Sequence, residues 1–196
     1  MQLLHLGDLE LTMPLAAAGG AWLLAARAWR AAAAWTVLYG GTIALVGGSK
    51  IAYLGWGTDI ALLGFKAFSG HAAGVAAVYP VLGYLLCRPG GRGLALAAAG
   101  AGLALGVVVA VLLVRQGEHT VAEAASGWML GTAASAGTLH QADTRGSGTG
   151  LACAACAVAV FAVGVALMQW AHVGYWMIKL ALALSGNAQP FPWDTC

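Results

Sequence analysis

Charged side chains are scarce in this sequence of 196 residues, in which nine are lysine or arginine and seven are aspartate or glutamate. They make up 8% of the chain, whereas a soluble domain carries roughly 25%. So few charges cannot cover a surface that faces water, which excludes an ordinary soluble globular protein. The net charge of +2 also excludes the basic surface that nucleic acid requires.

Cysteines are few as well, and they do not suggest a disulfide framework. The four are Cys87, Cys153, Cys156 and Cys196. Cys153 and Cys156 lie in the apolar run LACAACAVAVF, where small residues allow helices to approach closely. We therefore interpret them as helix-packing residues rather than as a redox or metal-binding CxxC site.

Long apolar runs dominate what is present, since 61% of the residues are hydrophobic. A membrane-crossing helix needs roughly 20 apolar residues. The runs predict six spans, at about 10–27, 31–49, 70–87, 93–114, 119–138 and 149–170. The first 14 residues contain no lysine or arginine and so lack the basic region of a cleavable signal peptide. We expect the first span to remain as a membrane anchor.

The apolar character continues past the sixth span, in HVGYWMIKLALALSG. One helix over residues 149–185 would be far longer than the ~30 Å hydrocarbon core. We expect a break near Gly174 and a further helix at the membrane interface, anchored by Trp170, Tyr175 and Trp176. The sequence thus predicts an all-α, single-domain protein over residues 1–196, a six-helix transmembrane bundle with an interfacial C-terminal helix.

The basic residues predict an orientation. One side carries Arg27, Arg30, Arg88, Arg92 and Arg145, and the other carries Lys50, Lys66, Arg115 and Lys179. The positive-inside rule places the five arginines in the cytoplasm. Three of the four cations on the other side belong to polar motifs, which leaves few charges there that only set topology. We therefore expect the polar motifs to face outward. The composition is rich in alanine and glycine, which is typical of GC-rich bacterial genomes, so we expect the membrane to be a bacterial inner membrane.

Three polar segments fall on that outward side, at residues 48–50, 66–71 and 115–123. Ionisable residues at membrane depth cost roughly 2.5–3.5 kcal/mol each, so they indicate a functional site. Two helix starts there would point free N–H groups at one place. Gly70 would let the backbone approach an anion, and Ser69 would supply a hydroxyl at the helix cap. With Lys50, Lys66 and Arg115 to neutralise charge, the pattern predicts a phosphate pocket.

His119 and Glu123 are four residues apart on the same predicted helix and so share a face. A carboxylate bonded to one imidazole nitrogen leaves the other as a nucleophile or base. His71 could then protonate the leaving oxygen. Two histidines with opposite proton roles indicate phosphoryl transfer.

These motifs resemble those of the phosphatidic acid phosphatase type 2 (PAP2) superfamily. FSGH at residues 68–71 resembles the family's PSGH motif, and His119-x3-Glu123-x3-Gly127 resembles the end of SR-x5-H-x3-D with the glycine that often follows. Lys50 matches the lysine that opens K-x6-RP. The resemblance covers about residues 48–131.

The resemblance implies a metal-independent membrane phosphatase or phosphotransferase without a cofactor. His119 would form a phosphohistidine, Glu123 would orient it, and His71 would be the general acid. The phosphate would be held by Lys50, Ser69, Gly70, Arg115 and Lys66. Bacterial enzymes of this kind act on lipid phosphates such as undecaprenyl diphosphate, phosphatidic acid or phosphatidylglycerophosphate, so the bilayer and such a lipid are the expected partners.

The sequence departs from the family pattern at both motif arginines. Gly57 and Thr58 stand where Arg-Pro is expected, and Leu113 stands six residues before His119. Lysine is a point charge rather than a bidentate fork, so the phosphate clamp is weakened even if Lys66 compensates. A non-catalytic relative that binds or moves a lipid phosphate is therefore the main alternative.

Two other functions fit parts of the sequence. A rhomboid-like intramembrane serine protease would use Ser69 with His172, although Ala67 occupies the glycine position of that family's GxS motif. A metal enzyme would use His71, His119 and Glu123, because two histidines and a carboxylate can hold zinc.

Overall fold

The computed structural model describes residues 3–143 and 150–192, and within them the protein is helical. The α-helices are α1 (Leu9–Ala25), α2 (Trp29–Trp56), α3 (Gly70–Cys87), α4 (Arg92–Arg115), α5 (Val121–Asp143), α6 (Leu151–Ala171) and α7 (Val173–Ser185). Short 3-10 helices are η1 (Leu4–Gly7), η2 (Ala61–Leu63) and η3 (Arg88–Gly90). The described ranges contain no strand beyond one isolated bridge between Ile60 and Phe65. The all-α prediction is confirmed.

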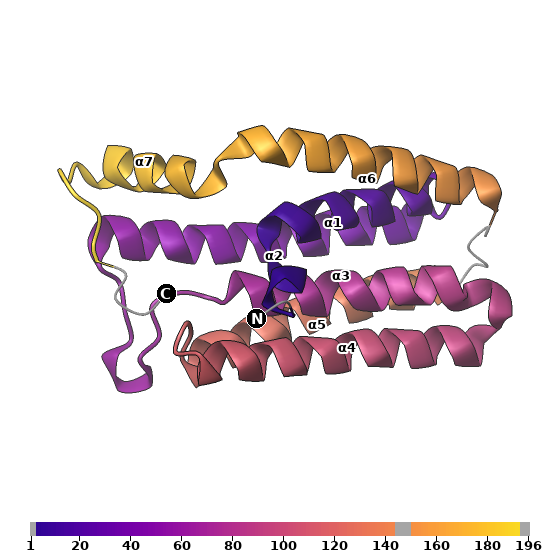
Figure 1. Cartoon of the computed structure of the whole chain (residues 1–196), viewed down its shortest axis with the longest axis horizontal. Helices are drawn as coiled ribbons and strands as arrows, with labels where there is room; N and C mark the ends of the chain where they lie inside the picture. The colour runs from indigo at the N-terminus through magenta and orange to yellow at the C-terminus, as the bar shows by residue number, and fades with distance from the viewer. Residues whose placement is uncertain (1–2, 144–149, 193–196) are drawn as a thin grey trace.

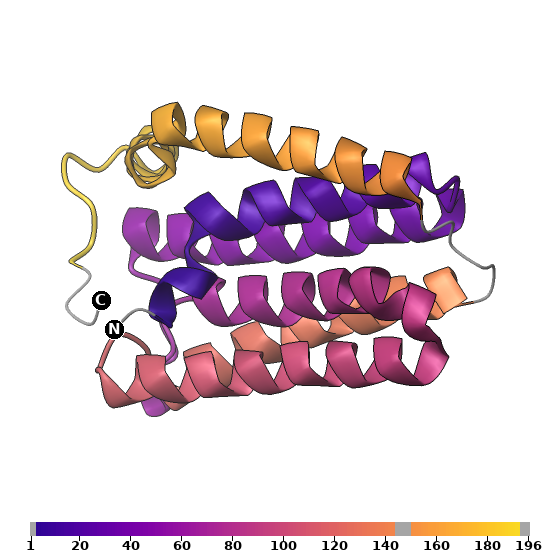
Figure 2. The ribbon, with the colours of Figure 1, turned by 45° about the vertical axis from the view of Figure 1, so that its right-hand side comes forward.

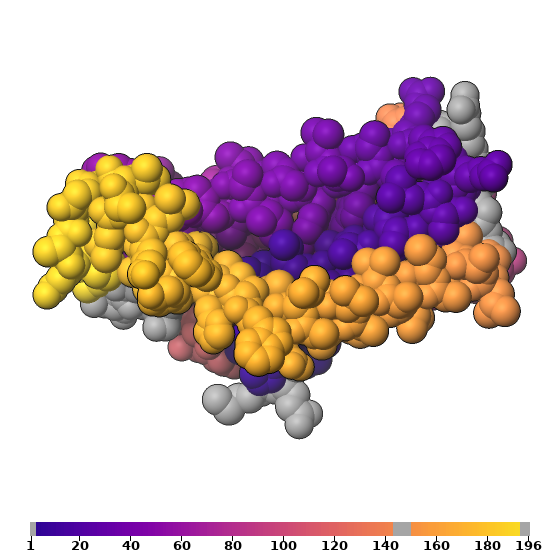
Figure 3. All heavy atoms as spheres, turned by 90° about the horizontal axis from the view of Figure 1, so that it is seen from above, coloured from indigo at the N-terminus to yellow at the C-terminus, as the bar shows by residue number. Residues whose placement is uncertain are grey.

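The long helices lie side by side along the long axis of the molecule, with α3 near the centre (Figure 1). On one side α3 packs against α4 and α5, and on the other side lie α1, α2 and α6. Small residues in its first half, GHAAGVAAV, allow these neighbours to come close. The space-filling view shows α1 recessed between α2 and α6 (Figure 3).

Among the described residues, four helices are long and apolar enough to cross a membrane: α2, α3 with its following turn, α4 and α6. Helices α1 and α7 are apolar but shorter, and α5 carries more polar residues. Membrane-capable helices are therefore confirmed, whereas a count of six spans is not established by length and composition.

The structure corrects two predicted boundaries. Helix α2 continues to Trp56, beyond the predicted end at 49, and Gly57 ends it in the left-handed conformation with φ 64°. An added Cβ there would lie 2.6 Å from the Phe191 ring, so both the backbone and the packing require glycine. Lys50 is consequently part of a helix rather than a residue beyond its end. Helix α5 begins at Val121, so His119 precedes it.

The break predicted near Gly174 is present two residues earlier, at His172, and Gly174 itself lies inside α7. His172 has a φ of 40°, a left-handed conformation that ends α6 and redirects the chain. Figure 2 shows the consequence, because α7 is seen nearly end-on while α6 runs across the view. The predicted anchors Trp170, Tyr175 and Trp176 are all exposed.

The interpretation of the cysteines as helix-packing residues is confirmed for Cys153, which is buried in the core, whereas Cys156 is exposed. Within the part of the chain that the structure describes, Cys87, Cys153 and Cys156 form no disulfide. Arg145 and Cys196 lie outside the described residues.

Two glycines bring α5 against α3. A Cβ at Gly127 would collide with the carbonyl oxygen of Ser69, and one at Gly131 would collide with that of Ala73. Glycines four residues apart form one flat strip on a helix, which permits such close approach. This contact positions the start of α5 beside the start of α3.

Candidate functional site

The three polar segments meet at one end of the bundle, at the left of Figure 1, where α2 ends and α3 and α5 begin. The turns that carry Arg27 and Arg88 lie at the opposite end. The two histidines of the predicted site therefore come from two helix starts at the same end of the molecule.

His119 and Glu123 form a buried pair. The Nδ1 atom of His119 lies 3.0 Å from Oε2 of Glu123, and the side chains are only 3% and 1% exposed. Because the carboxylate accepts a hydrogen bond from Nδ1–H, Nε2 keeps its lone pair. The contact predicted from the spacing of four residues is present.

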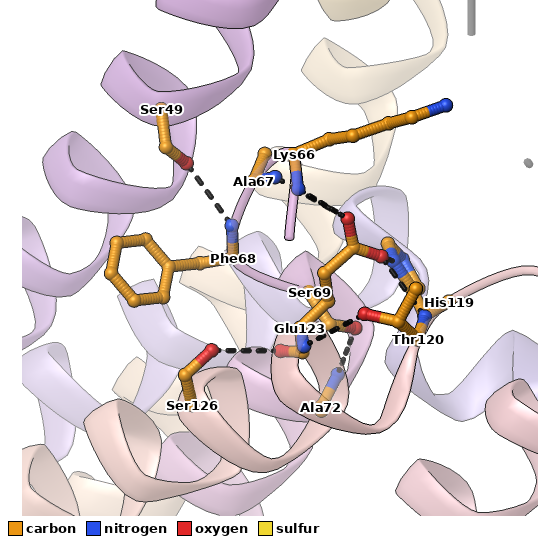
Figure 4. Close-up of polar contacts among 10 residues, drawn as sticks. All are labelled: Ser49, Lys66, Ala67, Phe68, Ser69, Ala72, His119, Thr120, Glu123 and Ser126. Atoms are coloured by element: carbon orange, nitrogen blue, oxygen red, sulfur yellow. Dashed lines mark hydrogen bonds and ion pairs between the residues drawn. The ribbon is translucent and has the colours of Figure 1, made fainter. Parts of the chain in front are cut away.

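The Glu123 carboxylate also ties the start of α3 to the start of α5 (Figure 4). Its Oε1 accepts hydrogen bonds from the backbone N–H groups of Lys66 at 2.8 Å and Ala67 at 3.4 Å. Its Oε2 accepts from the N–H of Thr120 at 3.1 Å as well as from His119. All four neighbours are N–H donors, so this position suits an ionised carboxylate.

Ser69 caps α3 as predicted, with its hydroxyl oxygen accepting from the N–H of Ala72 at 3.4 Å. It is fully buried, and its own N–H donates to the carbonyl oxygen of Glu123 at 3.2 Å. The Ser49 hydroxyl of α2 accepts from the N–H of Phe68 at 3.2 Å. Ser69 therefore fixes the start of the helix, and Gly70 and His71 follow as its first residues.

His71 has a partner that the sequence analysis did not identify. Its Nε2 lies 3.0 Å from Oδ1 of Asp8, and the other Asp8 oxygen lies 2.9 Å from Nδ1 of His5. Asp8 is 63 residues away from His71 in the chain. In the sequence, Asp8 stands out as an acidic residue in an apolar N-terminal segment. Only the fold shows that its carboxylate contacts His71.

Lys50 and His71 line one pocket of about 340 Å³. Asp8 and Glu10 from the start of α1 lie on its wall, and the α6–α7 break contributes His172. A Cβ at Gly70 would lie 3.9 Å from the Lys50 ammonium nitrogen. Gly70 therefore lies directly beside the Lys50 ammonium group.

Lys66 and Arg115 do not line the pocket that contains Lys50 and His71. The Lys66 ammonium sits over the Tyr53 ring, 5.3 Å from its centroid, and the side chain extends away from the Glu123 carboxylate (Figure 4). Arg115 is exposed at the end of α4 and lines a separate apolar pocket of about 310 Å³ with α5 residues including Trp128. The backbone of Lys66, rather than its charge, contributes to the His119–Glu123 arrangement.

The alternative chemistries find less support in this geometry. Ser69 is buried as a helix cap, whereas a protease nucleophile must be accessible. His172 lines the same pocket as His71, and Ser69 does not line it. Within the described ranges, no three side chains among His, Cys, Asp and Glu are placed to hold a metal ion together.

Burial lowers the pKa of His119 below its ordinary value of 6.5, because the imidazolium is poorly solvated. The hydrogen bond to Glu123 opposes this shift in the pKa, and the electrostatic effects of Lys50 and His71 add to it. Lys50 and His71 are therefore close enough to influence His119 electrostatically. The lowered pKa favours the neutral imidazole of His119.

We expect NMR titration of ¹⁵N-histidine-labelled protein to show His119 protonating below pH 6.5. The unfolded chain binds a proton on His119 more readily than the folded protein does. The free energy of unfolding should therefore decrease as the pH falls below 6.5, and His119 should have no effect on it at higher pH. A His119→Gln sample assigns the signal. A midpoint at or above 6.5 would contradict the prediction.

The comparisons with known proteins give no functional description. A protein of Klebsiella pneumoniae described as an uncharacterized 22.5 kDa protein in cps region is 37% identical over 131 residues, which are 66% of this chain and 63% of that protein. This chain thus covers less than two thirds of the relative's length. No protein-family model matches the sequence, and no solved structure matches it.

Proposed function

We propose that this protein is a membrane lipid phosphatase that hydrolyses a lipid phosphate or diphosphate through a phosphohistidine on His119. The observation that carries the proposal is the buried His119–Glu123 pair at the same end of the bundle as His71 and Lys50. The resemblance to the phosphatidic acid phosphatase type 2 superfamily supports the same assignment.

In the proposed reaction, the Nε2 lone pair of His119 attacks phosphorus while the bond from phosphorus to the lipid oxygen breaks. That oxygen takes a proton from His71. Water then attacks the phosphohistidine, the electron pair of the N–P bond returns to Nε2, and the proton of the water passes to His71. Glu123 holds the Nδ1–H of His119 throughout.

The phosphate oxygens would be held by Lys50 and by the free N–H groups at the start of α3. Ser69 would act by capping that helix, and Gly70 lies beside the ammonium group. Arg115 and Lys66 would need to move to reach the same phosphate, because their charged ends lie elsewhere.

The membrane arrangement that we propose has six spans, α1 to α6, with α7 at the interface. The turns with Arg27 and Arg88 would lie in the cytoplasm, so the site would face the outside or periplasm of a bacterial inner membrane. A site at the end of the spans suits a lipid whose tail stays in the bilayer while its phosphate enters the pocket.

A non-catalytic protein that binds or moves a lipid phosphate is the second candidate, and one observation favours it. Leu113, at the position of the expected motif arginine, is fully buried in a cluster with Val109. Gly57, at the other arginine position, ends α2. Neither position is available for a phosphate-binding arginine.

Phosphate release separates these functions. We expect purified protein in excess EDTA to release phosphate from at least one of phosphatidic acid, phosphatidylglycerophosphate and undecaprenyl diphosphate, because no step needs a metal ion. Loss of turnover in EDTA would favour the metal enzyme. Binding of these lipids without turnover of any would favour the second candidate.

A further inference from the structure

We infer that Asp8 is a positioning residue that orients the His71 ring toward the leaving oxygen. The inference rests on the proposed function, in which His71 donates the proton. Its basis is the 3.0 Å contact between Oδ1 of Asp8 and Nε2 of His71. No hydrogen bond involves Nδ1 of His71 among the described residues, so this nitrogen is the one that can serve the substrate.

The conformation of Asp8 supports this role. Asp8 occupies the N-cap position of α1, where an aspartate side chain commonly accepts a hydrogen bond from the first turn of its own helix. Here the side chain makes no such bond, and its two oxygens face His71 and His5 instead. The carboxylate is therefore directed toward the pocket rather than toward its helix.

The chain before Asp8 holds this carboxylate over α3. Leu4 is buried against α3 and α4, and the Tyr79 hydroxyl donates to the carbonyl oxygen of Leu6 at 3.1 Å. A Cβ at Gly7 would lie 2.8 Å from Cβ of His71, so the η1 turn rests directly on this histidine. The N-terminal segment thus forms one wall of the site.

Stability alone does not explain the contact. The His71 and Asp8 side chains are 32% and 38% exposed, and partly exposed ion pairs contribute little to folding. An oriented imidazole, by contrast, matters to a proton donor. Once the Nδ1 proton has passed to the leaving oxygen, Nε2–H still donates to Asp8, so the ring keeps its orientation for the following water step.

The test compares two phosphate esters in the Asp8→Asn variant. Phosphatidic acid needs a protonated leaving oxygen, whereas the p-nitrophenolate of p-nitrophenyl phosphate departs unaided. We expect turnover of phosphatidic acid to fall about 10- to 100-fold, within the roughly 10²–10⁴-fold contribution of a positioned acid, and turnover of p-nitrophenyl phosphate to change little. Asp8→Glu should restore part of the loss.

Two further measurements decide the outcome. In a His71→Ala background, Asp8→Asn should cause no additional loss, because the two residues act as one unit. Asp59→Asn, the same chemical change at an exposed position, should leave both activities unchanged. Equal loss of activity on both esters, or additive effects with His71→Ala, would overturn the inferred role of Asp8. Either result would leave the proposed phosphatase function unaffected. An inactive wild type would overturn the proposed function and this inference with it.

Discussion

Replacing His119 with glutamine is expected to reduce release of phosphate from the lipid substrate by roughly four to six orders of magnitude, the scale seen when a catalytic nucleophile is removed. Glutamine occupies similar space and can keep a hydrogen bond to Glu123, but it offers no lone pair that can form an N–P bond. The measurement is phosphate release by the purified variant beside the wild type. The loss should appear in kcat rather than in KM.

A chemical intermediate makes this prediction specific. Wild-type protein quenched during turnover of ³²P-labelled substrate should carry label that acid releases and alkali does not, which is the behaviour of a phosphohistidine. His119→Gln should carry none, and His140→Gln, an exposed histidine on α5, should behave as wild type. Normal labelling of His119→Gln would place the nucleophile elsewhere.

Glu123→Gln is expected to lower turnover by about 10⁴-fold, as when an orienting carboxylate in a catalytic triad is replaced by an amide. The four groups around the carboxylate are all N–H donors. Whichever way the new amide turns, its NH₂ group faces donors where an oxygen stood. Either His119 and Thr120 or Lys66 and Ala67 then lose their acceptor.

The structural part of this prediction can be separated from the catalytic part. Glu123→Gln should also lower the thermal unfolding midpoint in detergent, because a buried position loses two acceptors for its neighbours. Asp59→Asn supplies the matched control for loss of an exposed carboxylate. Glu123→Asp keeps the charge but is one methylene shorter, and should fall between wild type and Glu123→Gln. An active, equally stable Glu123→Gln would remove the carboxylate from the mechanism.

Much of the fold was predictable because its signals are local. The span predicted over 70–87 coincides with α3, whose start is set by the Ser69 cap, and 93–114 differs from α4 by one residue at each end. The predicted end of α2, at residue 49, was wrong for a physical reason. Lys50 resembled a boundary with water, but its side chain lines the pocket shared with His71, and the helix continues past it to Trp56.

The site was predictable to the extent that its partners are close in sequence. The His119–Glu123 pair joins residues only four apart across the start of α5, and a chain so poor in charge makes each polar motif conspicuous. The contact of Asp8 with His71 could not be predicted, because no local periodicity relates residues in different helices. The same holds for Arg115, whose short distance from His119 in sequence does not bring it to the pocket.

By itself the sequence determined an apolar, all-α protein with two of its three polar motifs at helix starts, because hydrophobic runs and helix caps act over a few residues. Tertiary structure decided which motifs meet. The glycine contact between α5 and α3 sets His119 beside the start of α3, and the packing of the N-terminal turn brings Asp8 to His71. Such juxtapositions depend on the close packing of side chains from distant segments, which no single stretch of sequence encodes.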